Sequence, residues 1–130
     1  MKILVSACLL GCPCRYDGQG KKHPEVEALR TRGHELIPVC PEVQGGLPTP
    51  RPPAERQRDG RGVNREGTDV TESYQAGAKL ALKTALEQGC ELAVLKERSP
   101  SCGSGEIYDG TFSRRLIPGD GVTAQQLRQA

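Results

Sequence analysis

The sequence lacks tryptophan, has only three tyrosines and one phenylalanine, and contains no long hydrophobic run. No segment approaches the roughly 20 apolar residues that span a bilayer, so we expect no contact with a membrane interior. The net charge of +2 is too small to favour a nucleic-acid duplex or a membrane surface as partner. These absences leave a small-molecule ligand as the natural partner.

An N-terminal secretion signal is also not expected. The first residues end in Leu-Leu-Gly-Cys, with Cys12 as the cysteine, which resembles a lipoprotein signal. A secretory signal needs about 15 to 30 residues, more than precede Cys12. We therefore interpret the segment as a buried strand and expect a cytoplasmic protein that forms one domain over residues 1–130.

Short runs rich in Ile, Leu and Val, at 2–7, 35–39 and 91–95, alternate with helical patterns. This arrangement is typical of buried parallel strands. We predict an α/β fold of a single domain, with a small, mostly parallel, Rossmann-like sheet flanked by helices.

Three of the six cysteines come shortly after these predicted strands: Cys8, Cys40 and Cys102. Parallel strands end at one edge of their sheet, and ligands bind beyond that edge. We therefore expect the three sulfurs to lie close together. Soft thiolates select zinc, copper(I) or iron–sulfur centres, so a metal site is favoured over a disulfide scaffold.

The other three cysteines carry weaker signals. Cys90 precedes a strand and so lies at the opposite edge of the sheet, where a structural thiol is expected. Cys12 and Cys14 complete a C-x3-C-x-C pattern with Cys8 that matches no standard zinc or ferredoxin spacing. They are either a fourth ligand or not involved. Three alternatives stay open: a catalytic cluster, a zinc-stabilised binding module, and a thiol redox sensor using Cys12 and Cys14.

Helix signals are clear at several positions. We expect a helix from Pro24 to about Arg32 and a last helix capped by Thr123. The longest helix is expected from a capping box at Asp69 and Glu72 to Gly89. Its apolar stripe contains seven residues: Val70, Tyr74, Gly77, Ala78, Ala81, Ala85 and Leu86. The dipeptide at 109–110, Asp-Gly, indicates a hairpin.

The segment 41–62 has the least regular pattern in the chain. Four of its residues between positions 48 and 53 are prolines, which favour an extended path. A structureless stretch of this length is either a binding loop or disordered. Its position directly after Cys40 favours a binding loop.

Polar residues near these cysteines are candidates for catalysis. Glu42 is two residues beyond Cys40 and is a candidate general acid or base. Ser99 and Ser101 precede Cys102, where they could hold a water or bind a carbonyl. Lys96 and Arg15 are candidates to neutralise a developing anion or a phosphate.

The motifs VSACLLG, CRYDG, PVCPE, GGLPTPRPPAE, LKERSPSCG, IYDGTFS and IPGDGVTA, which together extend over nearly the whole chain, resemble the bacterial thiouracil desulfidase family. The resemblance implies an α/β domain with a [4Fe-4S] cluster on Cys8, Cys40 and Cys102, whose fourth iron is free to take sulfur. It implies non-redox replacement of that sulfur by water, with Glu42 handling the water proton and Ser101 assisting.

The same resemblance implies a thiolated pyrimidine as substrate, either the free base, 4-thiouridine or its monophosphate, as in the salvage of transfer-RNA nucleotides. A phosphate would suit Arg15, Lys21, Lys22 and Arg51, and a base would stack on Tyr16, Tyr108 or Phe112. Asp17, in the same loop, completes the predicted substrate-binding set. We expect a monomer or a homodimer.

Overall fold

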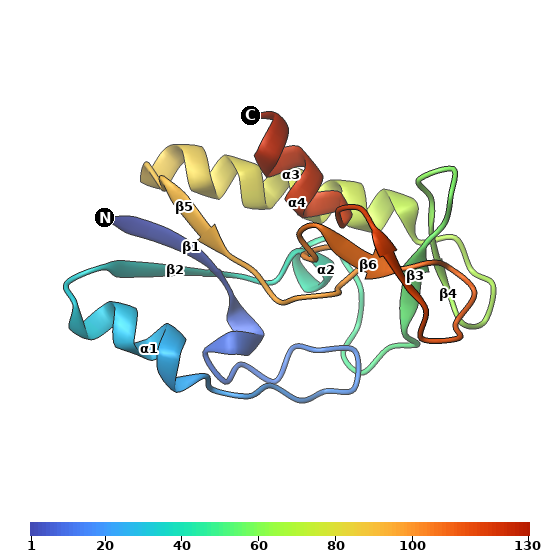
Figure 1. Cartoon of the computed structure of the whole chain (residues 1–130), viewed down its shortest axis with the longest axis horizontal. Coiled ribbons are helices and arrows are strands. Elements are labelled where there is room, and N and C mark those ends of the chain that lie inside the picture. The colour runs from blue at the N-terminus through green and yellow to red at the C-terminus, as the bar shows by residue number, and fades with distance from the viewer.

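The computed structural model describes residues 1–130, and it has the predicted parallel sheet (Figure 1). β1 (Lys2–Ser6) lies between β2 (Glu35–Val39) and β5 (Leu92–Val94) and pairs in parallel with both. The ends of the strands agree with the predicted ranges to within one residue. Because the three strands run in the same direction, their carboxyl ends lie at one edge of the sheet.

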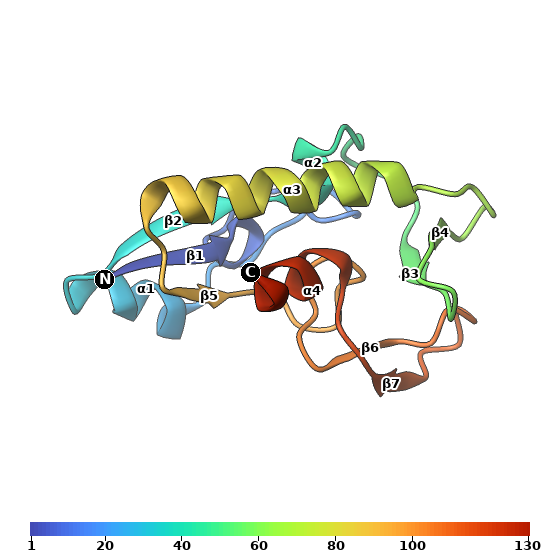
Figure 2. The ribbon, with the colours of Figure 1, turned by 90° about the horizontal axis from the view of Figure 1, so that it is seen from above.

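Both faces of the central strand are covered, which explains why its residues 3–5 are all apolar. Ile3 and Val5 pack toward α1 (Pro24–Thr31), where they join Val26. Leu4 points the opposite way and packs with Ala85 of α3 (Thr71–Gln88). Figure 2 shows α3 and α1 on opposite sides of the sheet. The alternation follows from the two-residue period of a strand.

The end of α3 is as predicted, but its beginning is not. Gly89 ends the helix in the left-handed conformation, with φ 69°. The expected capping box does not form, because Val70 holds the N-cap position and makes no side-chain cap bond. Asp69 still bridges Val63 in extended backbone, and its carboxylate accepts the Thr71 N–H at 2.9 Å. The helix therefore starts later than predicted.

The predicted stripe of α3 is largely correct. Five of its members are buried: Tyr74, Gly77, Ala78, Ala81 and Ala85. Leu86 is an exception, because it is 69% exposed beyond the packed part of the helix.

The last helix, α4 (Val122–Gln129), is capped by Gly121 and not by Thr123. Thr123 lies inside the first turn and is fully buried. Its hydroxyl pairs with the Ser101 hydroxyl at 2.8 Å, so it is not available to cap the helix.

The segment 41–62 contains more regular structure than its composition predicts. It begins with the one-turn helix α2 (Pro41–Gln44), and β3 (Ala54–Arg56) pairs antiparallel with β4 (Gly62–Asn64). Residues 45–53 contain neither helix nor strand. The expectation of an irregular segment is thus wrong at both ends.

Two glycines allow α2 to pack closely against α3. A Cβ at Gly77 would lie 1.8 Å from the Pro41 carbonyl oxygen, and one at Gly45 would lie 1.9 Å from that of Ser73. Real Cβ atoms do not approach so closely, so only glycine fits. Gly77 of α3 and Gly45 after α2 therefore bring the two helices close together.

A second hairpin follows the sheet, as predicted. β6 (Glu106–Tyr108) pairs antiparallel with β7 (Leu116–Pro118). The connection 109–115 is longer than a two-residue turn, and Asp109 accepts the Thr111 N–H within it. None of the helices combines the length and hydrophobicity that a membrane span requires.

Candidate active site

The three cysteines selected from the sequence line one cavity of about 520 Å³. Cys8 lies in the short 3-10 helix η1 (Ala7–Leu9) directly after β1. Cys40 follows β2 and precedes α2. Cys102 lies in the turn after β5. The volume is within the range usual for small-molecule sites. The strand direction therefore brings the three side chains to one space.

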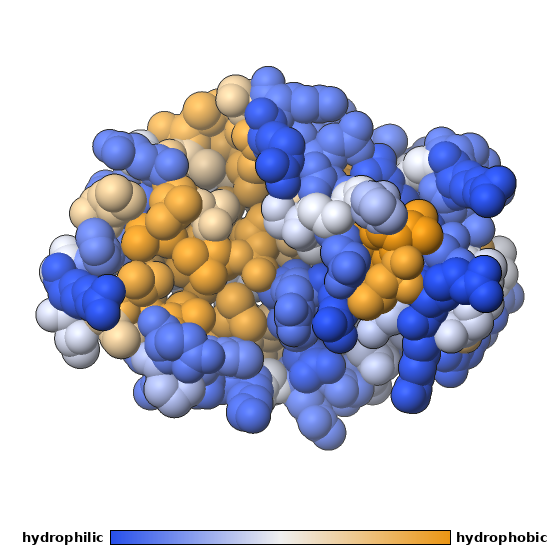
Figure 3. All heavy atoms as spheres, in the orientation of Figure 1, coloured by the Kyte–Doolittle hydropathy of each residue, from blue (hydrophilic) through white to orange (hydrophobic).

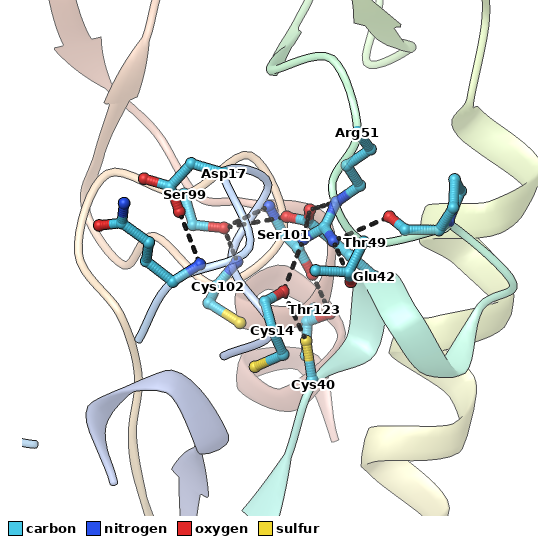
Figure 4. A network of polar contacts seen from close by, with 12 residues as sticks. Cys14, Asp17, Cys40, Glu42, Thr49, Arg51, Ser99, Ser101, Cys102 and Thr123 are labelled. Carbon is cyan, nitrogen blue, oxygen red and sulfur yellow. Dashed lines mark hydrogen bonds and ion pairs between the residues drawn. The ribbon is translucent and has the colours of Figure 1, made fainter. Parts of the chain in front are cut away.

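Cys14 is a fourth cysteine of this cavity. It is buried, and the Cys40 thiol is 3.7 Å from its carbonyl oxygen. Figure 4 shows the sulfurs of Cys14, Cys40 and Cys102 directed toward the same space. Cys12 is exposed, and Cys90 does not line the cavity. Sequence spacing alone did not separate Cys14 from Cys12.

The pKa values of the three buried thiols of the cavity are raised, which favours their protonated forms. Burial raises the pKa of Cys8, and the neighbouring Cys40 raises it further. Burial raises the pKa of Cys102 to about 12, although hydrogen bonds with the Ser6 and Ser101 hydroxyls oppose this shift. Burial and the nearby Cys40 raise the pKa of Cys14. A soft metal centre would displace these protons on binding.

The donor set fits an iron–sulfur cluster better than a single ion. Four cysteines line a cavity of about 520 Å³, which is far larger than a single ion. The thiolates around a four-iron cluster bind different irons and so surround a larger centre. Cysteines from three separate strand ends around a shared cavity meet that requirement.

Glu42 and Ser99 lie side by side in the lining of the cavity. Ser99 Oγ is 3.5 Å from Glu42 Oε1, at the outer limit of a hydrogen bond. The same hydroxyl accepts the backbone N–H groups of Ser101 and Cys102, at 3.1 and 3.0 Å. Ser99 is therefore held between the carboxylate and the turn that carries Cys102.

Ser101 has a different environment from the one predicted. It is fully buried, does not line the cavity, and bonds to the Thr123 hydroxyl. Its backbone N–H donates to Ser99 Oγ, and its carbonyl accepts the Thr123 N–H at 2.8 Å. These contacts assign Ser101 to support of the Cys102 turn, which leaves Ser99 as the serine that can face a substrate.

Arg51 also differs from its predicted role. It lines the cavity, but its side chain is only 6% exposed and forms an ion pair with Glu42 at 2.7 Å. Its other N–H groups bond to protein acceptors. The predicted phosphate contact is therefore not supported by the geometry. Sequence reasoning missed this pair because the two residues are joined across an irregular loop.

Five further predicted residues line the cavity: Arg15, Tyr16, Lys96, Tyr108 and Phe112. Asp17 does not, and its carboxylate accepts the Gln19 N–H within a tight turn. Lys21 and Lys22 are also outside the lining. Asp17 therefore shapes the loop rather than facing the cavity.

The structure adds cationic residues that the sequence did not single out: Arg65, Arg98 and Arg114. Arg98, Phe112 and Arg114 are the only non-glycine residues with positive φ, and all three line the cavity. Such backbone is uncommon for residues with side chains and is concentrated at functional sites. No local sequence pattern indicates it.

Together these features define a small α/β protein with a cysteine-lined cleft at the carboxyl edge of a parallel sheet, the kind of site that holds a soft-metal cluster. A family model described as 2-thiouracil desulfurase matches residues 3–130, and the chain belongs to this family.

Two relatives cover nearly all of the chain. A solved structure of TudS, a [4Fe-4S]-dependent thiouracil desulfidase, is 53% identical, with a TM-score of 0.91, and the match covers 98% of this chain and 85% of that one. The uncharacterized protein YbbK of Bacillus subtilis (strain 168) is 45% identical over 139 residues, covering 98% of this chain and 90% of YbbK. The similarity to TudS agrees with the α/β fold predicted from the sequence.

Proposed function

We propose that this protein is a [4Fe-4S]-dependent desulfidase that replaces the sulfur of a thiolated pyrimidine with oxygen. The observation that carries the proposal is that cysteines from three parallel strand ends share one cavity with a carboxylate. Membership of the 2-thiouracil desulfurase family and the likeness to TudS support it. The reaction consumes one water, releases sulfide and transfers no net electrons.

Cys8, Cys40 and Cys102 would hold the cluster, with Cys14 as a further thiol beside it. When bound, the cluster supplies a Lewis-acidic iron for a soft sulfur atom. The remaining chemistry is that of the chain itself. Its carboxylate must take a proton from the water that attacks the carbon bearing the sulfur.

Glu42 is suited to this step by position and by its contacts. It lines the cavity, its side chain is 14% exposed, and its two oxygens have different partners. Oε2 is held by Arg51, whereas Oε1 has only the long contact with Ser99. Oε1 is therefore the oxygen free to accept a proton from water, and the Ser99 hydroxyl orients it.

The charges around the cavity favour a substrate that carries a phosphate. Five cationic side chains line it in addition to Arg51: Arg15, Arg65, Lys96, Arg98 and Arg114. Three acidic residues also line it: Glu42 is paired with Arg51, Glu55 accepts the backbone N–H groups of Gly110 and Phe112, and Glu97 is exposed. Two of the five cations lie 3.9 Å from a carboxylate, Arg15 from Asp17 and Arg98 from Glu106. Three cations without an ion pair therefore remain against one exposed acid, Glu97. We propose a thiouridine monophosphate as preferred substrate over the free base.

The test is anaerobic reconstitution followed by a substrate panel. We expect about four irons per chain, a brown colour and sulfide release. The panel contains 2-thiouracil, 4-thiouracil, 4-thiouridine and its monophosphate. The highest kcat/KM for the monophosphate would support the nucleotide assignment, and the highest value for a free base would contradict it. Colourless protein with stoichiometric zinc and no sulfide release would contradict the function itself.

A further inference from the structure

The guanidinium of Arg51 has no donor left for a ligand. Its Nε and one Nη2 hydrogen both point to Glu42 Oε2, at 2.9 and 2.7 Å. Its Nη1 donates to Pro48 O and Thr49 Oγ1, both at 3.2 Å. Its Nη2 also donates to Cys14 O at 3.1 Å. A guanidinium carries five N–H groups, and five contacts account for all of them.

The contacts of Arg51 join α2 to the loop formed by residues 11–22. The backbone N–H of Arg51 donates to Tyr16 O at 2.8 Å, so the residue holds the loop 11–22 at two points, Cys14 and Tyr16. It also holds Glu42, on α2, through its carboxylate. Figure 4 shows the Arg51 side chain between Glu42, Thr49 and Cys14.

We infer that Arg51 is a positioning residue of the desulfidase: it holds Glu42 with one oxygen toward the cavity and does not itself bind substrate. This inference rests on the proposed function. Both bonds to Glu42 go to the same oxygen, Oε2, which fixes the direction in which Oε1 points. The ion pair is nearly buried, so removing the arginine would leave a carboxylate without a partner, free to turn to other donors.

Two variants separate positioning from substrate binding. Arg51→Gln should lower kcat by about 10²-fold, the scale of a misplaced catalytic group, and leave KM nearly unchanged. Arg51→Lys should not restore kcat, because an ammonium is a point charge without the five-donor fork. A rise in KM that is larger for a nucleotide than for a free base would overturn the inference, because it would make Arg51 a phosphate ligand.

The matched control is Arg56→Met. Arg56 is also a partly buried arginine, and it donates to the backbone carbonyls of Gly60 and Asp120. It bonds neither to Glu42 nor to the loop 11–22. It should keep wild-type kcat. An equal loss of kcat in Arg56→Met would overturn the inference by attributing the effect to general loosening of the loops.

A double-mutant cycle tests whether Arg51 acts through Glu42. In a Glu42→Gln background, Arg51→Gln should cause little further loss of kcat, because residues that act as one unit are not additive. If Arg51→Gln lowers kcat by the same factor in the Glu42→Gln background as in wild type, the inference is overturned.

Two readouts other than turnover keep this inference separate from the proposed function. Reconstituted Arg51→Gln should bind as much iron as wild type, and its crystal structure should show the Glu42 carboxylate rotated or displaced. Loss of iron, or an unmoved Glu42, would overturn the inference. If wild type binds iron but releases no sulfide from any substrate, the proposed function fails, and the Glu42 position still decides the role of Arg51.

Discussion

The two ends of the three-stranded sheet carry the same residue type in different environments. At the carboxyl end, Cys8, Cys40 and Cys102 line a shared cavity. At the amino end, Cys90 precedes β5, donates its N–H to Ala85 O and packs against the α3 side of the core. Strand direction, and not the local sequence around each cysteine, determines which thiols can act together.

The comparison is tested most strongly by Cys102→Ala. We expect loss of the cluster and of all sulfide release, because a thiolate that would hold the cluster is removed. Iron content, visible absorption and sulfide production measure the effect. Retention of both colour and turnover would mean that Cys14 or another thiol can replace Cys102.

Glu42→Gln should affect chemistry and leave the metal centre intact. Removing a general base lowers rate by about 10² to 10⁴-fold. We expect wild-type iron content with a kcat reduced by this factor. Unreduced turnover would exclude Glu42 from the reaction and shift attention to Ser99.

Gly77→Ala tests the contact that fixes α2, the helix of Glu42. A methyl group at this position overlaps the Pro41 carbonyl, so we expect about 1 to 3 kcal/mol of destabilisation in urea unfolding, together with reduced kcat. Gly89→Ala is the control, because its cost of about 1 kcal/mol comes from backbone conformation with no neighbour within 4 Å. Its kcat should be that of wild type. Equal kcat in the two variants would argue against crowding at α2.

The cluster-free protein should become less stable in alkali. Burial raises the pKa of Cys102 from 9.0 to about 12, so the folded state holds a proton that the unfolded state loses. The stabilisation is complete below pH 9 and declines as pH rises toward 12, by about 1.4 kcal/mol per pH unit at most. The difference in slope between wild type and Cys102→Ala, measured by urea unfolding under anaerobic, reducing conditions, isolates this thiol. Equal pH dependence of the unfolding free energy in the two proteins would contradict a raised pKa of Cys102.

Cys90→Ala should have the smallest effect of the five. We expect unchanged iron content and kcat, and a change in unfolding free energy of about 1 kcal/mol or less, because the residue is only half-buried. Loss of iron in this variant would overturn the contrast between the two ends of the sheet.

The sequence predicted the sheet because the central strand is buried on both faces at apolar residues 3–5, and because its two neighbours are also short, mostly apolar runs. The shared direction of these strands also predicted that Cys8, Cys40 and Cys102 lie close together. It missed the hairpin formed by β3 and β4, because these strands are short, largely polar and flanked by a proline-rich stretch. Local sequence patterns do not show which short, polar segments pair as strands.

The difference in environment between Ser99 and Ser101 has a similar cause. The two serines are separated only by Pro100, and their side chains point to different partners. Which one faces the cavity depends on the turn and on Thr123, which is distant in sequence. The role of Arg51 likewise depends on contacts with the loop 11–22 and with α2, neither of which is adjacent to it.

Close packing of α2 on α3 at Gly45 and Gly77 has a consequence for how this enzyme can change. The proposed proton acceptor is anchored to the longest helix, and few substitutions there preserve the fit. The cationic residue Arg98 lies instead in an isolated bridge to Ile107 of β6, and Arg114 lies in the connection 109–115 between β6 and β7. New substrate preferences should therefore arise by mutation of Arg98 and of the connection 109–115, while Glu42 on α2 is inherited unaltered.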